Sequence, residues 1–257
     1  MDEKINHSLH LIKESLETYH EKVAVGCSWG KDSMVLLHLA LQVNPHIPIF
    51  SILTIHKPKE SFDFVVRTSH QYNIQPKIYM VAKEVPSIFK KNSMDVTLLP
   101  IDTYEKEAKR IKETTGREIY FEDPNLCCDL LKVVPIKYAY EDMKLQAWLS
   151  GLRNTEGHTR AFLQEKEIRS SNEVKINPIL YWTEQEVWDY IKQYDIPTHP
   201  WYTKEFPDGK KIRSLGCEPC TVPVHDHEDE RDGRWRKTKK KAGECGIHTR
   251  NLKDEDA

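Results

Sequence analysis

The stretch from Val23 to Leu41 reads VAVGCSWGKDSMVLLHLAL, and it decides the fold class. Its first five residues form a short apolar run typical of a buried strand, and Cys27 at the end of that run is expected to be a small core residue. Its last eight residues predict an apolar helix. The turn between them contains Gly30, where the backbone can approach a ligand closely. A strand, a glycine-containing turn and a helix in this order open a parallel α/β fold.

Outside this unit, the apolar pattern predicts further elements of the same fold. They are a helix over residues 3–20, a buried strand over 47–54, a helix over 62–71, and strands over 77–80 and 146–152. Thr183 and Glu186 form a capping box, which opens a helix over 184–194. Residues 81–125 show no clear pattern. We therefore predict a mostly parallel, twisted sheet with helices on both faces.

Composition narrows the class of protein. The chain has 257 residues, 38 Lys+Arg against 40 Asp+Glu and 39% hydrophobic residues, which is enough for one large domain with a sizeable core. The balanced charge argues against a dedicated nucleic-acid binder. The chain has no run of 18 apolar residues, and its first 20 residues are too polar for a signal peptide. We expect a cytoplasmic protein with no membrane or nucleic-acid partner.

The turn Ser28-Trp-Gly-Lys-Asp-Ser33 has the chemistry of a phosphate-binding loop. The helix amides beyond Gly30 are unpaired donors that favour an anion. Lys31 adds a mobile positive charge, and the hydroxyls of Ser28 and Ser33 add further donors. The turn lacks the two glycines of a Walker A loop, but SxGKDS resembles the pyrophosphate loop of the adenine nucleotide alpha hydrolase superfamily. We expect Ser28, Gly30, Lys31, Asp32 and Ser33 to bind a nucleotide, with an ordinary strand-to-helix turn as the alternative.

Four of the six cysteines fall into two short pairs, Cys127-Cys128 and Cys217-x-x-Cys220. In a reducing compartment such pairs favour a metal or cluster over disulfides, and four thiolates complete a four-coordinate site. An adjacent pair is awkward for a zinc site, which prefers two to four intervening residues. Lys132 lies one helical turn past Cys128 and would offset the negative charge of a cluster. We predict a [4Fe–4S] cluster, with zinc as the alternative.

Cys245 stands apart near the end of the chain, in a segment without a core pattern. The lysine-rich residues 237–241, together with Arg231, Arg234 and His248, would favour its thiolate and make it nucleophilic. A mobile segment would carry it to a substrate and then present it to a second protein. A bystander surface cysteine is the alternative.

Four motifs occur in order along the second half of the chain. They are Cys127-Cys128-x-x-x-Lys132-x-x-Pro135, Gly216-Cys217-x-Pro219-Cys220-Thr221, Glu230-Arg231-x-Gly233-Arg234-Trp235 and Glu244-Cys245-Gly246-Ile247-His248. With the upstream loop, they make the chain similar to the assimilatory sulfonucleotide reductases, the family of adenylyl-sulfate and phosphoadenylyl-sulfate reductases. The resemblance spans nearly the whole sequence. It implies an α/β nucleotide-binding domain over residues 1–215, with a cluster-binding insertion, and a C-terminal segment over 216–257.

The resemblance also implies a reaction. The thiolate of Cys245, with His248 as a second catalytic residue, attacks the sulfur of the sulfonucleotide and leaves an S-sulfocysteine. Thioredoxin or glutaredoxin then releases sulfite. The cluster lies beside the active site without being the electron donor, and Lys132 links it to the substrate. Members of this family are often oligomeric, so a homo-oligomer is expected.

Further positions match the family's substrate-binding residues. They are Arg153, Arg231 and Arg234, with Glu156 and Arg160 as weaker candidates. Arginine and lysine would neutralise the sulfonate and the leaving phosphate. Members that carry both cysteine pairs usually reduce adenylyl sulfate, and members that lack them require the 3′-phosphorylated nucleotide, so the chain is expected to prefer adenylyl sulfate.

The sequence departs from the family pattern at three places. The loop keeps the full Lys31-Asp32-Ser33, which is more typical of ATP-using pyrophosphate-loop enzymes, and its lysine would favour a 3′-phosphate. Leu53 replaces an expected acid, and Leu131 replaces an expected arginine. The alternatives to an adenylyl-sulfate reductase are therefore a phosphoadenylyl-sulfate reductase and an ATP-using sulfur-transfer enzyme with an iron–sulfur cluster. A nucleotide-binding or cluster-sensing module without turnover would leave Cys245 and its basic neighbours unexplained.

Overall fold

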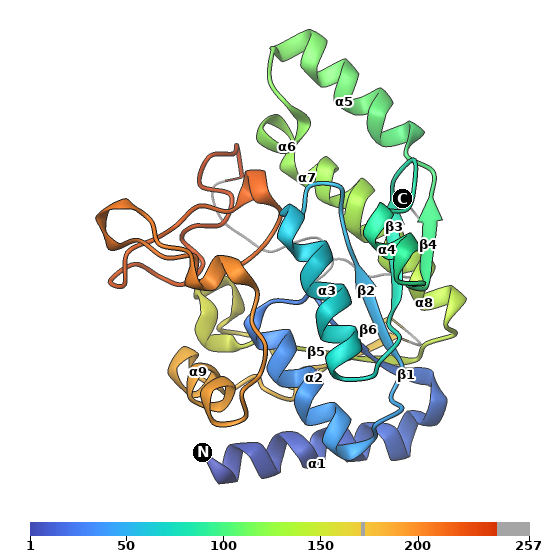
Figure 1. The fold of residues 1–257 in the computed structure, drawn as a ribbon, viewed down its shortest axis with the longest axis vertical. Coiled ribbons are helices and arrows are strands. Elements are labelled where there is room, and N and C mark those ends of the chain that lie inside the picture. Colours follow the sequence, from blue (N-terminus) through green and yellow to red (C-terminus); the bar gives the residue numbers. More distant parts are fainter. Residues whose placement is uncertain (171–172, 241–257) are drawn as a thin grey trace.

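The fold is built on a seven-stranded sheet (Figure 1). The computed structural model describes residues 1–170 and 173–240. The strand order is β4-β3-β2-β1-β5-β7-β6, and every neighbouring pair is parallel except β6 and β7. The strands are β1 Val23–Gly26, β2 Ile49–Ile52, β3 Lys77–Val81, β4 Val96–Leu99, β5 Ala147–Ser150, β6 Lys166–Ser170 and β7 Glu173–Ile176. The predicted mostly parallel sheet is confirmed.

Helices cover both faces of this sheet, as predicted. They are α1 Asp2–Tyr19, α2 Lys31–Val43, α3 Lys59–Gln71, α4 Ser87–Lys91, α5 Asp102–Thr115, α6 Ile119–Glu122, α7 Pro124–Cys128, α8 Val134–Asp142 and α9 Glu184–Gln193. Figure 1 shows α5 standing out from the sheet at the top of the view. Across residues 1–170 and 173–240, no helix combines the length and apolar content that a membrane span needs.

Alternation along β1 sends its side chains to two separate apolar clusters. Val23 and Val25 face the larger cluster, which includes buried residues of α1, α2, α3 and α9. Ala24 faces a smaller cluster with Trp148 of β5 and with Ile136, Ala139 and Tyr140 of α8. Because β1 pairs with both β2 and β5, its carboxyl end lies in the middle of the sheet, where ligands of open α/β folds bind.

The apolar pattern of the sequence does not predict the elements that bury charged residues or few apolar residues. In β7, Glu173 and Lys175 are both fully buried, so the strand does not read as an apolar run. The ammonium of Lys175 lies 2.8 Å from the Glu167 carboxylate of β6, which compensates for its burial. In the unassigned region, α5 buries only Tyr104 and Ile111, and the rest of this helix is mostly charged or polar. The apolar face of this helix is too narrow for apolar periodicity to predict it from the sequence.

His199, buried before a short turn, gives a pH-dependent stability. Its Nδ1 accepts a hydrogen bond from the Trp201 amide at 3.1 Å, and its Nε2 lies 3.0 Å from the Ser61 hydroxyl, so the neutral ring fits both partners. Burial, and then the nearby Lys57, lower the pKa of His199 from 6.5 to about 4. Between pH 6.5 and pH 4, the His199 ring is therefore protonated in the unfolded chain but mostly neutral in the folded state. The free energy of unfolding falls as the pH drops from about 6.5 to about 4.

We expect this loss to reach about 3 kcal/mol at pH 4. Urea denaturation at a series of pH values would measure it. The variant His199→Asn keeps an acceptor for the Trp201 amide and removes the titrating ring. Its free energy of unfolding should change less over this pH range than that of the original chain, and equal changes would contradict the assignment.

Candidate active site

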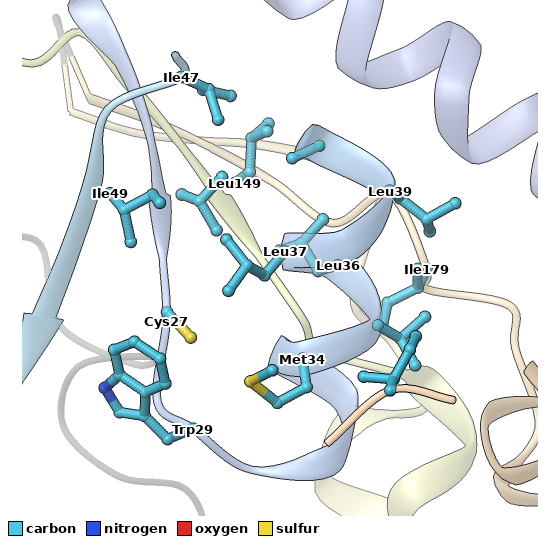
Figure 2. Packing of buried hydrophobic residues seen from close by; sticks show 14 of the residues in the cluster. Cys27, Trp29, Met34, Leu36, Leu37, Leu39, Ile47, Ile49, Leu149 and Ile179 are labelled. Carbon is cyan, nitrogen blue, oxygen red and sulfur yellow. The ribbon is translucent and has the colours of Figure 1, made fainter. Parts of the chain in front are cut away.

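The phosphate loop is held rigidly between β1 and α2. Trp29 adopts a left-handed backbone conformation with φ of 64°, and its buried indole donates a hydrogen bond to Ser51 of β2 at 2.8 Å. Figure 2 shows Trp29 and Cys27 beside Met34 in the apolar cluster under α2. The Ser33 hydroxyl donates to the Gly30 carbonyl at 2.9 Å, and the Ser28 hydroxyl donates to Ser33 at 3.2 Å. The amino end of α2 is thus fixed at the carboxyl edge of the sheet.

This edge opens into a cavity, here called the central cavity. Its walls come from the phosphate loop, the carboxyl ends of β2 and β5, the start of α8 and the segment 214–235. One part of the lining is apolar and includes the rings of Phe50 and Trp148, which pack edge to face with centroids 6.0 Å apart. Gly26 leaves room for both rings, because a Cβ there would lie 2.8 Å from the Trp148 ring. This part suits a flat heterocycle.

Another part of the lining is cationic. It consists of Lys57, Lys132, Arg231 and Arg234, and is here called the cationic wall. The Arg234 guanidinium donates to the Leu215 carbonyl at 3.1 Å and stacks 4.6 Å from the ring centroid of Trp235. Gly216 leaves room for this guanidinium, because a Cβ at this position would displace it. Four cations at one cavity favour a ligand with more than one negative charge.

Lys31 and Arg153 do not line the central cavity, although both were expected to contact substrate. Their side chains are fully buried, and they form a network with Asp32 and Glu230, here called the buried charge network. Lys31 lies 3.1 Å from Asp32 and pairs with Glu230. Arg153 donates to Asp32 at 2.6 Å and to both Glu230 oxygens at 2.6 and 2.8 Å. The expectation of a mobile Lys31 is wrong, because its ammonium is held by protein carboxylates.

Charges inside this network balance. Burial acts against ionisation of Asp32, but Arg153 and Lys31 outweigh it and hold the pKa of Asp32 well below its ordinary value. Carboxylate oxygens of Asp32, Glu156 and Glu230 lie within 4.8 Å of one another, which is close enough for a metal ion. Arg153 and Lys31 neutralise two of these groups, and the third, Glu156, pairs with Arg160. These cations take the place that a metal would have.

The four cysteines of the two pairs converge on a second, smaller cavity, here called the cysteine cavity. Cys127 and Cys128 come from the end of α7, and Cys217 and Cys220 from a 3-10 turn 90 residues later. All four are buried and free of disulfides. Trp235 and Lys132 line both this cavity and the central cavity. The two cavities therefore adjoin at these two side chains, and Lys132 of the cationic wall also faces the cysteine cavity.

The arrangement fits a polynuclear cluster better than a single zinc ion. A tetrahedral zinc site, with zinc–sulfur bonds of about 2.3 Å, needs sulfurs within about 4 Å of one another. Among the described residues, the sets of ligand atoms that lie within 4.8 Å of one another do not include these cysteines. At Cys217, burial acts against the thiolate, but Lys132 and Lys57 outweigh it and lower the pKa of this thiol. The Thr54 hydroxyl lies 3.2 Å from the same sulfur.

Comparison with known proteins agrees with this geometry. A family model described as the phosphoadenosine phosphosulfate reductase domain matches residues 22–223. The chain belongs to this family. An adenosine 5'-phosphosulfate reductase of Halalkalibacterium halodurans is 34% identical over 242 residues, which cover 94% of this chain and 91% of that protein. One of Staphylococcus haemolyticus is 32% identical over 250 residues, covering 96% and 89%.

Two solved structures share this fold. A phosphoadenylyl-sulfate reductase from Candida auris, in a phosphate complex, superposes with a TM-score of 0.61 at 22% identity, covering 84% of this chain and 90% of that one. An FMN adenylyltransferase of Candida glabrata, bound to FAD and inorganic pyrophosphate, gives a TM-score of 0.58 at 15% identity, covering 94% and 75%. The predicted α/β fold with a mostly parallel sheet is thus confirmed.

For this reductase family member, the structure sorts the predicted site residues into three groups. The central cavity is lined by Ser28, Gly30, Asp32, Ser33, Lys132, Glu156, Arg160, Arg231 and Arg234. Lys31 and Arg153 lie behind that lining in the buried charge network. Cys245 and His248 lie outside the described residues. The predicted core position of Cys27 is confirmed, because its side chain is only 2% exposed.

Sequence reasoning missed several lining residues of this reductase site. Phe50 and Trp148 read as ordinary apolar strand residues, and nothing local marks them as a ligand surface. Tyr202, whose hydroxyl accepts a hydrogen bond from the Lys31 amide at 3.2 Å, comes from the segment without apolar period. Lys57 lies three residues after the buried run 47–54, and its position just beyond a predicted strand was the available signal.

Proposed function

We propose that this chain reduces adenylyl sulfate to sulfite and AMP, with Cys245 as the nucleophile and thioredoxin or glutaredoxin as the reductant. The observation that carries the proposal is the meeting of three features: the phosphate loop and the cationic wall line the central cavity, and the four buried cysteines line the adjoining cysteine cavity. The curated relatives from Halalkalibacterium halodurans and Staphylococcus haemolyticus, both named adenosine 5'-phosphosulfate reductase, support the same substrate. The free cysteines suit a reducing compartment such as the cytoplasm.

The cavity offers a matching group for each part of the nucleotide. The adenine fits the apolar part, against Phe50 and Trp148. The phosphate fits the amino end of α2, where backbone amides and the hydroxyls of Ser28 and Ser33 donate. The sulfonate then faces the cationic wall, where Arg231 and Arg234 supply charge-assisted hydrogen bonds.

The reaction proceeds in three displacements at sulfur. The thiolate of Cys245 attacks the sulfonate sulfur, the bond from that sulfur to the bridging oxygen breaks, and its electron pair leaves with AMP. A thiolate of the reductant then attacks Sγ of the S-sulfocysteine, and sulfite departs with the electron pair of the sulfur–sulfur bond. The second thiol of the reductant resolves the mixed disulfide and frees Cys245. His248, three residues away, would favour the thiolate.

The four cysteines at the cysteine cavity would hold a [4Fe–4S] cluster. When bound, such a cluster supplies an inorganic charge centre beside the shared residues Lys132 and Trp235. The chemistry of the displacement needs no electron from it. Lys132 would neutralise charge on the sulfonate from one side, while its position is fixed by the turn that follows Cys128.

Replacing Cys217 with serine should remove iron from the protein. The wild-type chain should carry about four irons and absorb near 400 nm, and the variant should lose most of both. Cys27→Ser is the matched control, because Cys27 is a buried cysteine outside the cysteine cavity. One bound zinc in place of iron in the wild-type protein, or full iron in the Cys217 variant, would contradict the cluster.

The proposed function is tested by intact-protein mass spectrometry without reductant. After mixing with adenylyl sulfate, the protein should gain one sulfonate on Cys245. Faster labelling by the 3′-phosphorylated nucleotide would identify a phosphoadenylyl-sulfate reductase instead. No adduct with either nucleotide, together with cleavage of ATP to AMP and pyrophosphate, would favour the ATP-using alternative. The buried pairing of Lys31 argues against that alternative, since the ammonium faces Asp32 and Glu230.

A further inference from the structure

Lys57 is a lysine of the central cavity that neither the family motifs nor the sequence analysis assigns. It lies between β2 and α3, and its half-buried side chain lines the cavity beside the phosphate loop. Its ammonium lies 3.4 Å from the carbonyl oxygen of Ser28. Within the described parts of the chain, no carboxylate lies within 4.0 Å of this ammonium. Lys57 thus differs from Lys31, which is neutralised inside the protein.

Without a bound ligand, the surroundings of Lys57 disfavour the charged form of its side chain. Burial lowers the pKa of Lys57 to about 8, and the cations Lys132 and Arg234 act in the same direction, while the thiols of Cys217 and Cys27 oppose it. A partly buried ammonium among like charges destabilises a protein unless an anion compensates it. The protein supplies a carbonyl dipole from Ser28, which is a weak partner for a full charge. An anionic ligand would supply the missing charge.

We propose that Lys57 binds the phosphosulfate of the substrate at its phosphate side. This inference rests on the proposed function and adds a residue to it. The ammonium lies against Ser28, the residue that begins the phosphate loop, whereas Lys132 lines both the central cavity and the cysteine cavity. When the sulfur–oxygen bond breaks, the phosphate of AMP gains negative charge. A cation on the loop side stabilises that leaving group in the transition state.

The binding test compares Lys57→Met with Lys57→Arg, each against the wild-type chain. Calorimetric titration, with Cys245→Ser added to every protein so that no adduct forms, would give dissociation constants for adenylyl sulfate and for adenosine. A charge-assisted contact predicts an affinity for adenylyl sulfate that is about 10-fold or more lower in Lys57→Met, with adenosine unchanged. Lys57→Arg should recover most of the loss. Lys59→Met is the matched control, because Lys59 is an exposed lysine two residues away, and its affinities should not change.

Two further readouts separate the possible failures. Iron content and absorbance near 400 nm should be the same in Lys57→Met and wild type, and a loss of iron would show that Lys57 serves the cysteine site rather than the substrate. Sulfonation of Cys245 in a single turnover should be slowed about 10- to 100-fold in Lys57→Met. If the wild type fails to form the adduct, the proposed function is contradicted. The contact of Lys57 with the phosphosulfate is still tested by the dissociation constants. Unchanged affinity for adenylyl sulfate in Lys57→Met would overturn the inference.

Discussion

Replacing Cys245 with serine should abolish sulfite release, with a loss of turnover on the order of 10³ or more, the scale on which enzymes lose activity without their nucleophile. A serine hydroxyl is not ionised at neutral pH, so it attacks the sulfonate poorly. Any sulfate ester that formed on serine would also resist a thiol reductant, because it has no sulfur–sulfur bond to exchange. Thioredoxin-coupled sulfite release, measured with adenylyl sulfate, gives the comparison.

Nucleotide binding should survive in the same variant. The residues assigned to adenine and phosphate, such as Trp148 and Ser33, belong to the sheet edge and to α2 and are unchanged in this variant. The dissociation constant for AMP should therefore stay within about 3-fold of wild type. Cys27→Ser is the control for a general effect of losing a thiol. Burial raises the pKa of Cys27 to about 11, so this residue is a poor thiolate and its replacement should cost far less turnover than the loss of Cys245.

An S-sulfonate on another cysteine of the Cys245→Ser protein would contradict this assignment. Sulfite release that persists at more than a few per cent of the wild-type rate would contradict it as well. Absorbance near 400 nm should be retained in the variant, which separates loss of the nucleophile from loss of the cysteine site.

The fold was predictable because its deciding signals are local. A strand, a phosphate loop and a helix follow one another within Val23–Leu41, and the structure has β1 and α2 in those places. The capping box of Thr183 and Glu186 is also a local signal, and both of its hydrogen bonds are present. The two cysteine pairs were assigned together from donor chemistry and motif order, and the structure brings all four to one cavity.

What the sequence did not reveal depends on partners distant along the chain. Lys31 has the residue type and the place of a phosphate ligand, but its partner Glu230 lies 199 residues later. Lys57 carries no motif, and its importance comes from the absence of a nearby carboxylate in the described structure, which only the packing reveals. In β7, Glu173 and Lys175 are buried although they are charged, so the sequence lacks the apolar run that predicts a buried strand. Spacing predicts local elements, whereas charge compensation is decided by tertiary contacts.

The buried charge network should hold the C-terminal motif against the phosphate loop. Glu230 immediately precedes Arg231 of the cationic wall, and its carboxylate meets Lys31 at the start of α2 and Arg153 after β5. Three segments are thus tied at one buried point. Removing one partner leaves an uncompensated charge inside the protein, which typically costs about 3–5 kcal/mol.

Lys31→Met and Glu230→Gln should each destabilise the chain on this scale, as measured by urea denaturation. The double variant leaves Asp32 paired with Arg153 and restores the balance of charge. Its free energy of unfolding should therefore exceed the value expected from adding the two single losses, by about 1–3 kcal/mol. Two additive losses would show that Lys31 and Glu230 are not coupled.

The exposed pair Lys83 and Glu105, 2.7 Å apart, provides the control for this cycle. Water already screens both of its charges, so Lys83→Met should change stability by less than about 1 kcal/mol. The double variant of the buried pair should also bind adenylyl sulfate more weakly than wild type while it remains folded, because Arg231 then loses the anchor beside it. That weakening would connect the intact Lys31-Asp32-Ser33 loop to substrate binding through the position of the cationic wall, without direct contact between Lys31 and the nucleotide.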